Sequence, residues 1–130
     1  IILLILAVAG FAFAAAPVHK HGLTPEMRRQ HQAMSQTNKH WQTCKKYLEK
    51  GNFRAAAAAL GKMQKALAGL EKFQLHKNSE KAEEFREQTH AFKENLSQLG
   101  AAIKSKDKIA VASLSQTVSD GCLKCHSAFR

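Results

Sequence analysis

Acidic residues are scarce in this chain of 130 residues, and cysteines are few. Ten aspartates and glutamates stand against 20 lysines and arginines, which gives a formal net charge of +10 at pH 7. Such a charge indicates an acidic partner or surface. Most of the lysines are scattered singly along the chain, and this distribution argues against nucleic acid as that partner. Of the three cysteines, two are close together and one is far away, which suits a ligand pattern better than a disulfide framework.

The length and the apolar content indicate one packed domain. Domains commonly contain about 100–150 residues, and apolar residues make up 45% of this chain. Aromatic and branched aliphatic side chains are too frequent for a disordered protein. We therefore expect a single folded unit with a hydrophobic core.

The first 16 residues contain no charged or polar side chain. A membrane-spanning helix needs about 20 apolar residues, so this run is short. Ala12-Phe13-Ala14 fits the small-x-small rule of signal peptidase, which favours export to the periplasm over an uncleaved membrane anchor. No stable membrane insertion is expected after cleavage. The expected organisation is a signal peptide at residues 1–14 without its basic first region, a flexible segment at 15–22 and a folded domain at 23–130.

Helix signals dominate the folded domain, and strand signals are absent. Thr24, Pro25 and Glu26 have the residue types of an N-cap, a first-turn proline and a first-turn acid. Four amphipathic helices follow, each with apolar residues at three- and four-residue steps. They are expected from Thr24 to Gly51, from Asn52 to Phe73, from about Ser79 to Lys106, and from Asp107 to Phe129. Joined by short links, such helices predict an all-α, antiparallel up-down-up-down four-helix bundle.

The last of these helices contains Cys122-Leu123-Lys124-Cys125-His126, which is the c-type haem attachment sequence. Positions i, i+3 and i+4 share one face of a helix. The two thiols can therefore reach the two vinyl groups of one porphyrin, and the histidine beside them can be the proximal iron ligand. A redox dithiol is less favoured because no strand–helix alternation is present. Half a zinc site is less favoured because no second Cys/His pair has finger-like spacing.

With four helices and this motif near the C-terminus, residues 23–130 resemble the class II c-type cytochromes, the cytochrome c prime family. The last residues are similar to that family's characteristic ending: Cys122, Cys125, His126, Phe129 and Arg130. The resemblance implies one haem c, covalently bound to both cysteines near the C-terminal end of the bundle. It also implies His126 as the proximal iron ligand and Arg130 near the haem edge.

Apolar residues on the helix faces are the candidates for the rest of the haem pocket. They are Phe85, Phe92, Leu67, Leu70 and Val118. One departure from the family is the very short second link, near Lys77-Asn78, where family members often have a longer connection. Any helical bundle would have apolar residues at these five positions, so their residue types do not by themselves indicate haem.

The first helix is expected to face the far side of the iron, and the resemblance places Met34 there. Thioether and imidazole ligation together favour electron transfer, whereas an aliphatic residue at this position leaves an open iron that binds nitric oxide or carbon monoxide. His31 and Met27 are rival ligands, and core filling is the other interpretation of Met34. Family members often have an arginine four residues before this position, where this chain has Gln30.

Other residues are assigned to structural or solvent-exposed roles. We expect Cys44 and Trp41 in the core and His40, His76 and His90 at the surface. The predicted function is that of an exported one-electron carrier, not an enzyme, which meets an acidic redox partner. Family members often form dimers, so the resemblance also leaves a homodimer open. The alternatives are a five-coordinate binder of nitric oxide or carbon monoxide and a haem-free helical module that binds metal or another protein.

Overall fold

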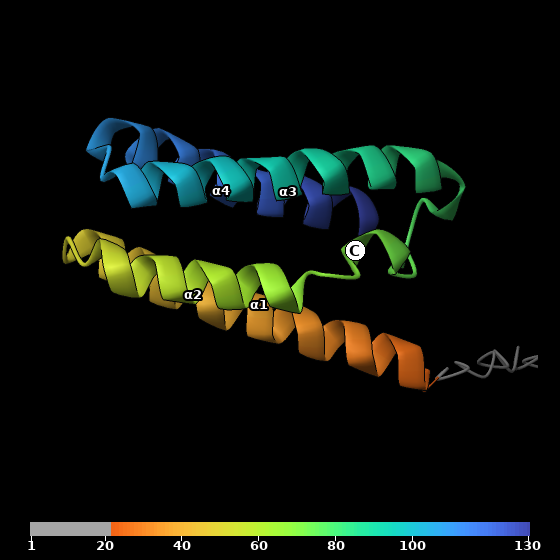
Figure 1. The fold of residues 1–130 in the computed structure, drawn as a ribbon. Helices are drawn as coiled ribbons and strands as arrows, with labels where there is room; N and C mark the ends of the chain where they lie inside the picture. Colours follow the sequence, from red (N-terminus) through yellow and green to blue (C-terminus); the bar gives the residue numbers. More distant parts are fainter. Residues whose placement is uncertain (1–21) are drawn as a thin grey trace, which may run out of the picture.

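The computed structural model describes residues 22–130, which form four α-helices with two short 3₁₀ helices between the second and third (Figure 1). The elements are α1 (Pro25–Glu49), α2 (Phe53–Ala66), η1 (Leu70–Lys72), η2 (Ser79–Lys81), α3 (Ala82–Ser105) and α4 (Lys108–Phe129). No strand occurs among the described residues, which confirms the expected all-helical class. The predicted signal peptide at 1–14 and nearly all of segment 15–22 lie outside these residues.

Side-chain caps set the first residues of three helices, as the sequence predicts. The hydroxyl of Thr24 accepts a hydrogen bond from the Met27 N–H at 3.1 Å. The side-chain Oδ1 of Asn52 accepts a hydrogen bond from the Ala55 N–H at 3.0 Å. Oδ1 of Asp107 accepts one from the Ala110 N–H, also at 3.0 Å. Each bond satisfies an N–H that has no partner within its helix. Gly51, with φ +68°, allows the tight turn between α1 and α2.

The second helix is shorter than expected, and the prediction that it extends to Phe73 is wrong. The structure ends α2 at Ala66, and residues 67–81 form a long connection that contains η1 and η2. The prediction of a very short second link is therefore also wrong. Leu67, Leu70 and Phe73 are three residues apart, a spacing that suits a 3₁₀ helix as well as an α-helix. The apolar pattern therefore could not reveal the break.

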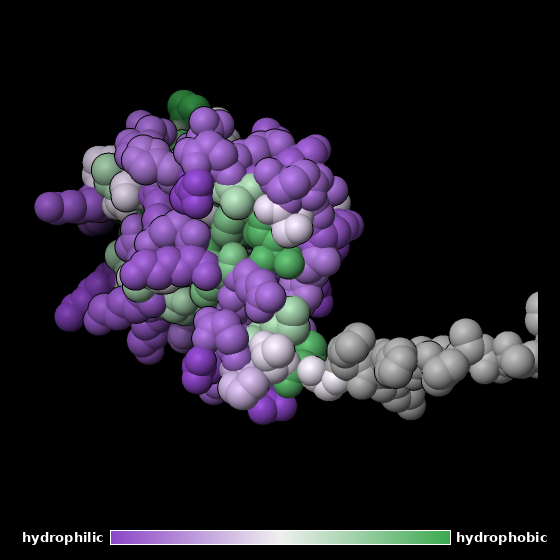
Figure 2. All heavy atoms as spheres, turned by 90° about the vertical axis from the view of Figure 1, so that its right-hand side faces the viewer, coloured by the Kyte–Doolittle hydropathy of each residue, from purple (hydrophilic) through white to green (hydrophobic). Residues whose placement is uncertain are grey.

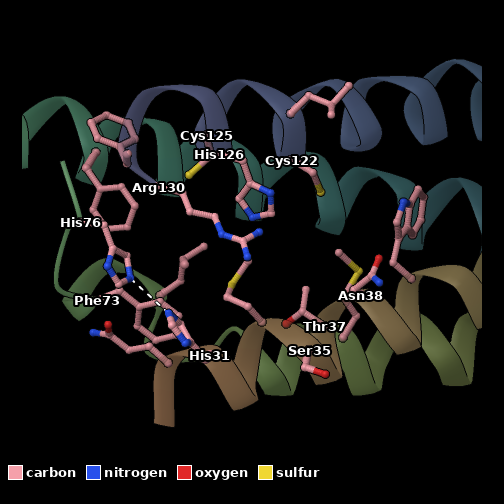
Figure 3. Close-up of a pocket in the computed structure, with 18 of the residues that line it drawn as sticks. His31, Ser35, Thr37, Asn38, Phe73, His76, Cys122, Cys125, His126 and Arg130 are labelled. Atoms are coloured by element: carbon pink, nitrogen blue, oxygen red, sulfur yellow. Dashed lines mark hydrogen bonds between the residues drawn. The ribbon is translucent and has the colours of Figure 1, made fainter. Parts of the chain in front are cut away.

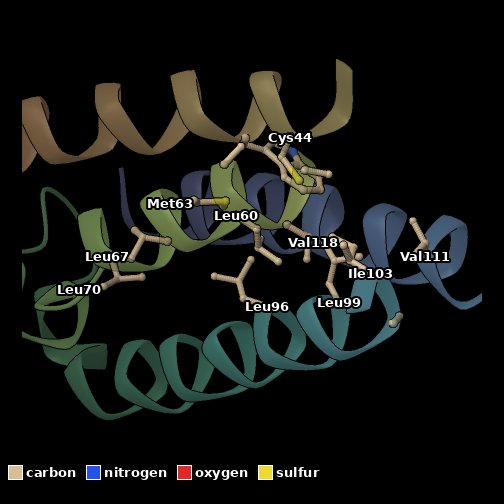
Figure 4. Close-up of a cluster of buried hydrophobic side chains, with 14 of the residues drawn as sticks. Cys44, Leu60, Met63, Leu67, Leu70, Leu96, Leu99, Ile103, Val111 and Val118 are labelled. Atoms are coloured by element: carbon tan, nitrogen blue, oxygen red, sulfur yellow. The ribbon is translucent and has the colours of Figure 1, made fainter. Parts of the chain in front are cut away.

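The core lies between the helices, with α1 packed mainly on α2 and α3 mainly on α4 (Figures 1 and 4). Its largest fully buried side chains are Cys44, Leu60, Met63, Leu67, Leu96, Leu99, Ile103 and Val118. Burying one such leucine, isoleucine or valine contributes about 1.5–3 kcal/mol, so this cluster is the main source of stability. The expectation that Cys44 and Trp41 are core residues is confirmed. Among the described residues, no helix combines the length and apolar character needed to cross a membrane.

The connection between α2 and α3 contacts the C-terminal end of α4. The backbone N–H of His76 donates to the carbonyl oxygen of Phe129 at 3.2 Å. The side-chain amide of Asn78 donates to the carbonyl oxygen of Ala128 at 2.6 Å. The ring of Phe129 also meets Phe85, near the start of α3, edge to face at 5.2 Å. The last turn of α4 is thus held by two other parts of the chain at one end of the molecule (Figure 1).

Candidate cofactor site

A cavity of about 580 Å³ lies between α1, α4 and the connection that follows α2. Its volume is within the range of about 300–1,000 Å³ that is typical of ligand pockets. Most of its surface is apolar, with Trp41, Met63, Leu70, Phe73 and Phe85 among the lining residues. Figure 2 shows apolar atoms at the centre of this end of the molecule, surrounded by hydrophilic side chains. The site can therefore enclose a largely apolar ligand.

Cys122, Cys125 and His126 all line this cavity from α4. All three are half-buried, and Figure 3 shows their side chains on the side of α4 that faces α1. The helix is continuous through the motif, so the expected shared face is present. The structure therefore brings both thiols and the imidazole to one ligand-sized space.

Gly121, just before the first of these cysteines, allows α4 to approach α3 closely. A Cβ atom at this position would lie 2.8 Å from Cδ2 of the Phe92 ring. Such a contact is too short for carbon atoms, so any larger residue would displace the ring or the helix. The motif-bearing part of α4 is thus seated directly on Phe92. Nothing in the sequence alone indicates this role for the glycine.

Burial keeps the motif side chains neutral at neutral pH. It raises the pKa of the Cys125 thiol, and it raises the pKa of Cys122, with a further increase from Cys125 and a partial offset from Lys45. Burial also lowers the pKa of His126, and the positive charge of Arg130 lowers it further. A neutral imidazole has a free nitrogen lone pair, which is the form that binds a metal.

The opposite wall of the cavity comes from α1, where Met34 is half-buried and lines the cavity. His31 also lines it but is exposed, and its Nε2 atom lies 3.3 Å from Nε2 of His76. Met27 is half-buried and is not a lining residue. Of the three predicted candidates for a second iron ligand, Met34 is therefore the one that is both half-buried and part of the cavity lining.

Gln30 brings a buried polar group to the same wall. Only 3% of this residue is exposed, and its Nε2 atom has no hydrogen-bond partner. A buried donor without an acceptor costs about 1–3 kcal/mol. Gln30 also lines the cavity, so a bound molecule with an acceptor atom would remove this cost. Arg130, at the end of α4, contributes a second donor group to the lining.

The predicted lining residues divide into two groups. Phe85 and Leu70 line the cavity. Leu67 and Val118 do not line it; both are fully buried in the core. Phe92 does not either, because its ring packs against Gly121. All five positions lie on apolar faces, and the sequence pattern cannot distinguish a side chain in the core from one at a cavity wall.

The predictions for His90 and His76 have different outcomes. His90 is exposed and lies away from the cavity lining, as predicted. His76 is exposed as predicted, but it also lines the cavity and contacts His31. This second role was not predicted, because residues 73–78 were expected to form the end of a helix and a short link. No apolar pattern surrounds His76 that would have indicated it.

The cavity combines two thiols, a neutral imidazole and a thioether, all on helices whose positions the core determines. Thiols can be linked covalently to a porphyrin, and imidazole and thioether are both ligands of haem iron. The buried amide of Gln30 and the guanidinium of Arg130 add donors for acidic or carbonyl groups. These residues alone define the site, since the chain matches no family model, no curated protein and no solved structure.

Proposed function

We propose that the protein is a periplasmic monohaem c-type cytochrome that carries single electrons and catalyses no reaction of its own. The observation that carries this proposal is the position of Cys122, Cys125 and His126, which together line one mainly apolar cavity of about 580 Å³. The Cys-x-x-Cys-His sequence is the known attachment motif for c-type haem. An apolar, ligand-sized space beside it is what that function requires.

The residues of the cavity fit haem c in kind and in charge state. Cys122 and Cys125 would hold the porphyrin by two thioether bonds, and His126 would bind the iron through its neutral imidazole. When bound, haem supplies the one-electron chemistry of its iron. Gln30 and Arg130 would donate hydrogen bonds to its acidic groups, which would satisfy the buried amide of Gln30.

Met34 is the residue that we propose as the second protein ligand of the haem iron. It lines the cavity from α1, whereas Met27 does not. His31 is exposed and has its Nε2 atom beside another imidazole. Methionine and histidine ligation raises the reduction potential and favours electron transfer over gas binding.

The proposed topology is an up-down-up-down four-helix bundle, and the proposed partner is an acidic redox protein. The formal net charge of +10 supports this choice of partner. Attraction between opposite charges can raise association rates about 10- to 1,000-fold, and salt weakens it. We expect electron exchange with such a partner to slow as the ionic strength rises.

Optical spectra of the protein from a host that matures c-type cytochromes test the ligand assignment. We expect a low-spin reduced-minus-oxidised spectrum in the wild type and in His31→Ala, and its loss in Met34→Ala. Carbon monoxide should bind the ferrous Met34→Ala variant readily and the wild type poorly. Ready binding to the wild type would contradict closure by Met34 and would favour a gas-binding protein. A colourless protein would contradict the cytochrome and favour a haem-free module.

A further inference from the structure

Two histidines from distant parts of the chain meet at the edge of the cavity. His31 is on α1, and His76 lies in the connection between η1 and η2. Their Nε2 atoms are 3.3 Å apart, their ring centroids are 5.3 Å apart, and the ring planes differ by 29° (Figure 3). Both side chains are exposed, so an ion in solution can reach them.

The separation of the two nitrogens is suited to chelation. Hydrogen bonds from N–H groups are usually about 2.7–3.2 Å long, so 3.3 Å is a long contact. Zinc binds histidine nitrogens at about 2.0–2.1 Å with tetrahedral geometry, which places two such nitrogens about 3.3–3.4 Å apart. The distance between His31 and His76 therefore already equals that between two ligands of one ion.

We propose that His31 and His76 form a binding site for a divalent transition metal, separate from the haem site. Imidazole suits Zn²⁺, Cu²⁺ and Ni²⁺, and Cu²⁺ should bind most tightly of these. Among residues 22–130, no group of three or more histidine, cysteine or acidic side chains could hold a metal. Two imidazoles from the protein are thus the ligands, and water completes the coordination.

This site would connect two parts of the structure that the cavity depends on. His31 is three residues before Met34 on α1, and the backbone N–H of His76 is bonded to Phe129 on α4. A metal bound by both imidazoles would fix α1 against the connection at the cavity edge. Nε2 of His31, once bound to this metal, could not also bind the haem iron.

Competition of the mature, full-length protein with a chromogenic chelator for Zn²⁺ and Cu²⁺ tests this proposal. The assay uses a His19→Ala/His21→Ala background, because those two histidines could also bind metal. We expect one ion per chain and about 100-fold or greater loss of affinity in His31→Ala and in His76→Ala, because the second ligand acts as an intramolecular one. The loss in the double variant should be far smaller than the product of the two single losses, because either single substitution already removes the chelate.

His90→Ala is the matched control, since His90 is exposed on α3 and lies away from the cavity. It should bind metal as the parent does. Circular dichroism should show unchanged helix content in every variant. Unchanged affinity in His31→Ala or in His76→Ala would overturn the proposal and leave the pair as a hydrogen-bonded contact. If the protein carries no haem, the assay is repeated in a Cys122→Ala/Cys125→Ala background, because free thiols beside His126 would themselves bind Zn²⁺ and Cu²⁺. Failure of the cytochrome assignment would then leave the result for His31 and His76 interpretable.

Discussion

Gly121 is the residue at which the packing of α4 is tightest. A Cβ added there would be 2.8 Å from Cδ2 and 3.2 Å from Cε2 of Phe92. Gly121→Ala should therefore displace the ring or the helix and lower the free energy of unfolding by about 1–3 kcal/mol. The shift should also reduce haem attachment, since Cys122 is the next residue. Urea denaturation and haem staining of a denaturing gel measure the two effects.

Gly61 provides the matched control for this substitution. It lies in α2, and nothing is within 4 Å of the Cβ that an alanine would add. Gly61→Ala should raise the free energy of unfolding by about 0.5–1 kcal/mol, because alanine has the higher helix propensity. Equal effects of the two alanines would show that Phe92 does not restrict α4.

At the scale of the elements, a hydrogen bond from Asn78 joins the segment between α2 and α3 to the end of α4. Its side chain donates to the Ala128 carbonyl at 2.6 Å, and its own backbone is left-handed, with φ 54°. The last carbonyls of a helix have no partner within the helix. Asn78→Asp retains a short side chain that tolerates this backbone but removes the donor. We expect a loss of about 1–2 kcal/mol in the free energy of unfolding.

Amide hydrogen exchange locates this effect in the chain. In Asn78→Asp, exchange should accelerate at the last turn of α4, around His126, and not at the start of α4, around Val111. If the variant and the wild type exchange at the same rates along all of α4 and are equally stable, the hydrogen bond does not hold the turn that contains the motif.

The ion pair between Lys93 on α3 and Glu71 in η1, with Nζ and Oε2 2.5 Å apart, predicts a pH dependence. The hydrogen bond from Lys93 is the main cause that lowers the pKa of Glu71 below its ordinary value of 4.5. A lowered pKa in the folded state adds stability above pH 4.5, and this contribution is lost as the pH falls through the folded-state pKa. Wild type should thus be more stable than Glu71→Gln at pH 7, and the difference should shrink in acid.

Chemical denaturation from pH 7 to pH 3 measures this difference. Both partners are more than one-third exposed, so the effect should be small and should decrease with salt. Glu87→Gln, at an exposed position on α3, should show no comparable change. A constant gap between wild type and Glu71→Gln at every pH would contradict the role of this carboxylate.

Local signals in the sequence predicted helix starts better than helix ends. Thr24, Asn52 and Asp107 each satisfy a nearby backbone N–H, so the residue types alone indicate the caps. The end of α2 depends instead on contacts across the fold. Lys93 of α3 holds the connection through Glu71, a bond between residues 22 positions apart. No local pattern contains that information.

At the scale of the whole molecule, the candidate site was predictable where its residues share one helix. Cys122, Cys125 and His126 are adjacent on α4, so their common face follows from helix geometry. His76 and His31 are 45 positions apart, and their contact depends on how the connection folds. Whether an apolar residue lies in the core or at the cavity likewise depends on the packing of all four helices.

The mass of the mature protein, purified from a host that matures c-type cytochromes, tests the central claim most directly. We predict the polypeptide mass plus one haem, retained after denaturation and accompanied by Soret absorbance. A Cys122→Ala/Cys125→Ala variant made in the same host should have the polypeptide mass alone after denaturation. If the wild type also has only its polypeptide mass and no Soret absorbance, the cavity does not carry covalent haem and the proposed function is wrong.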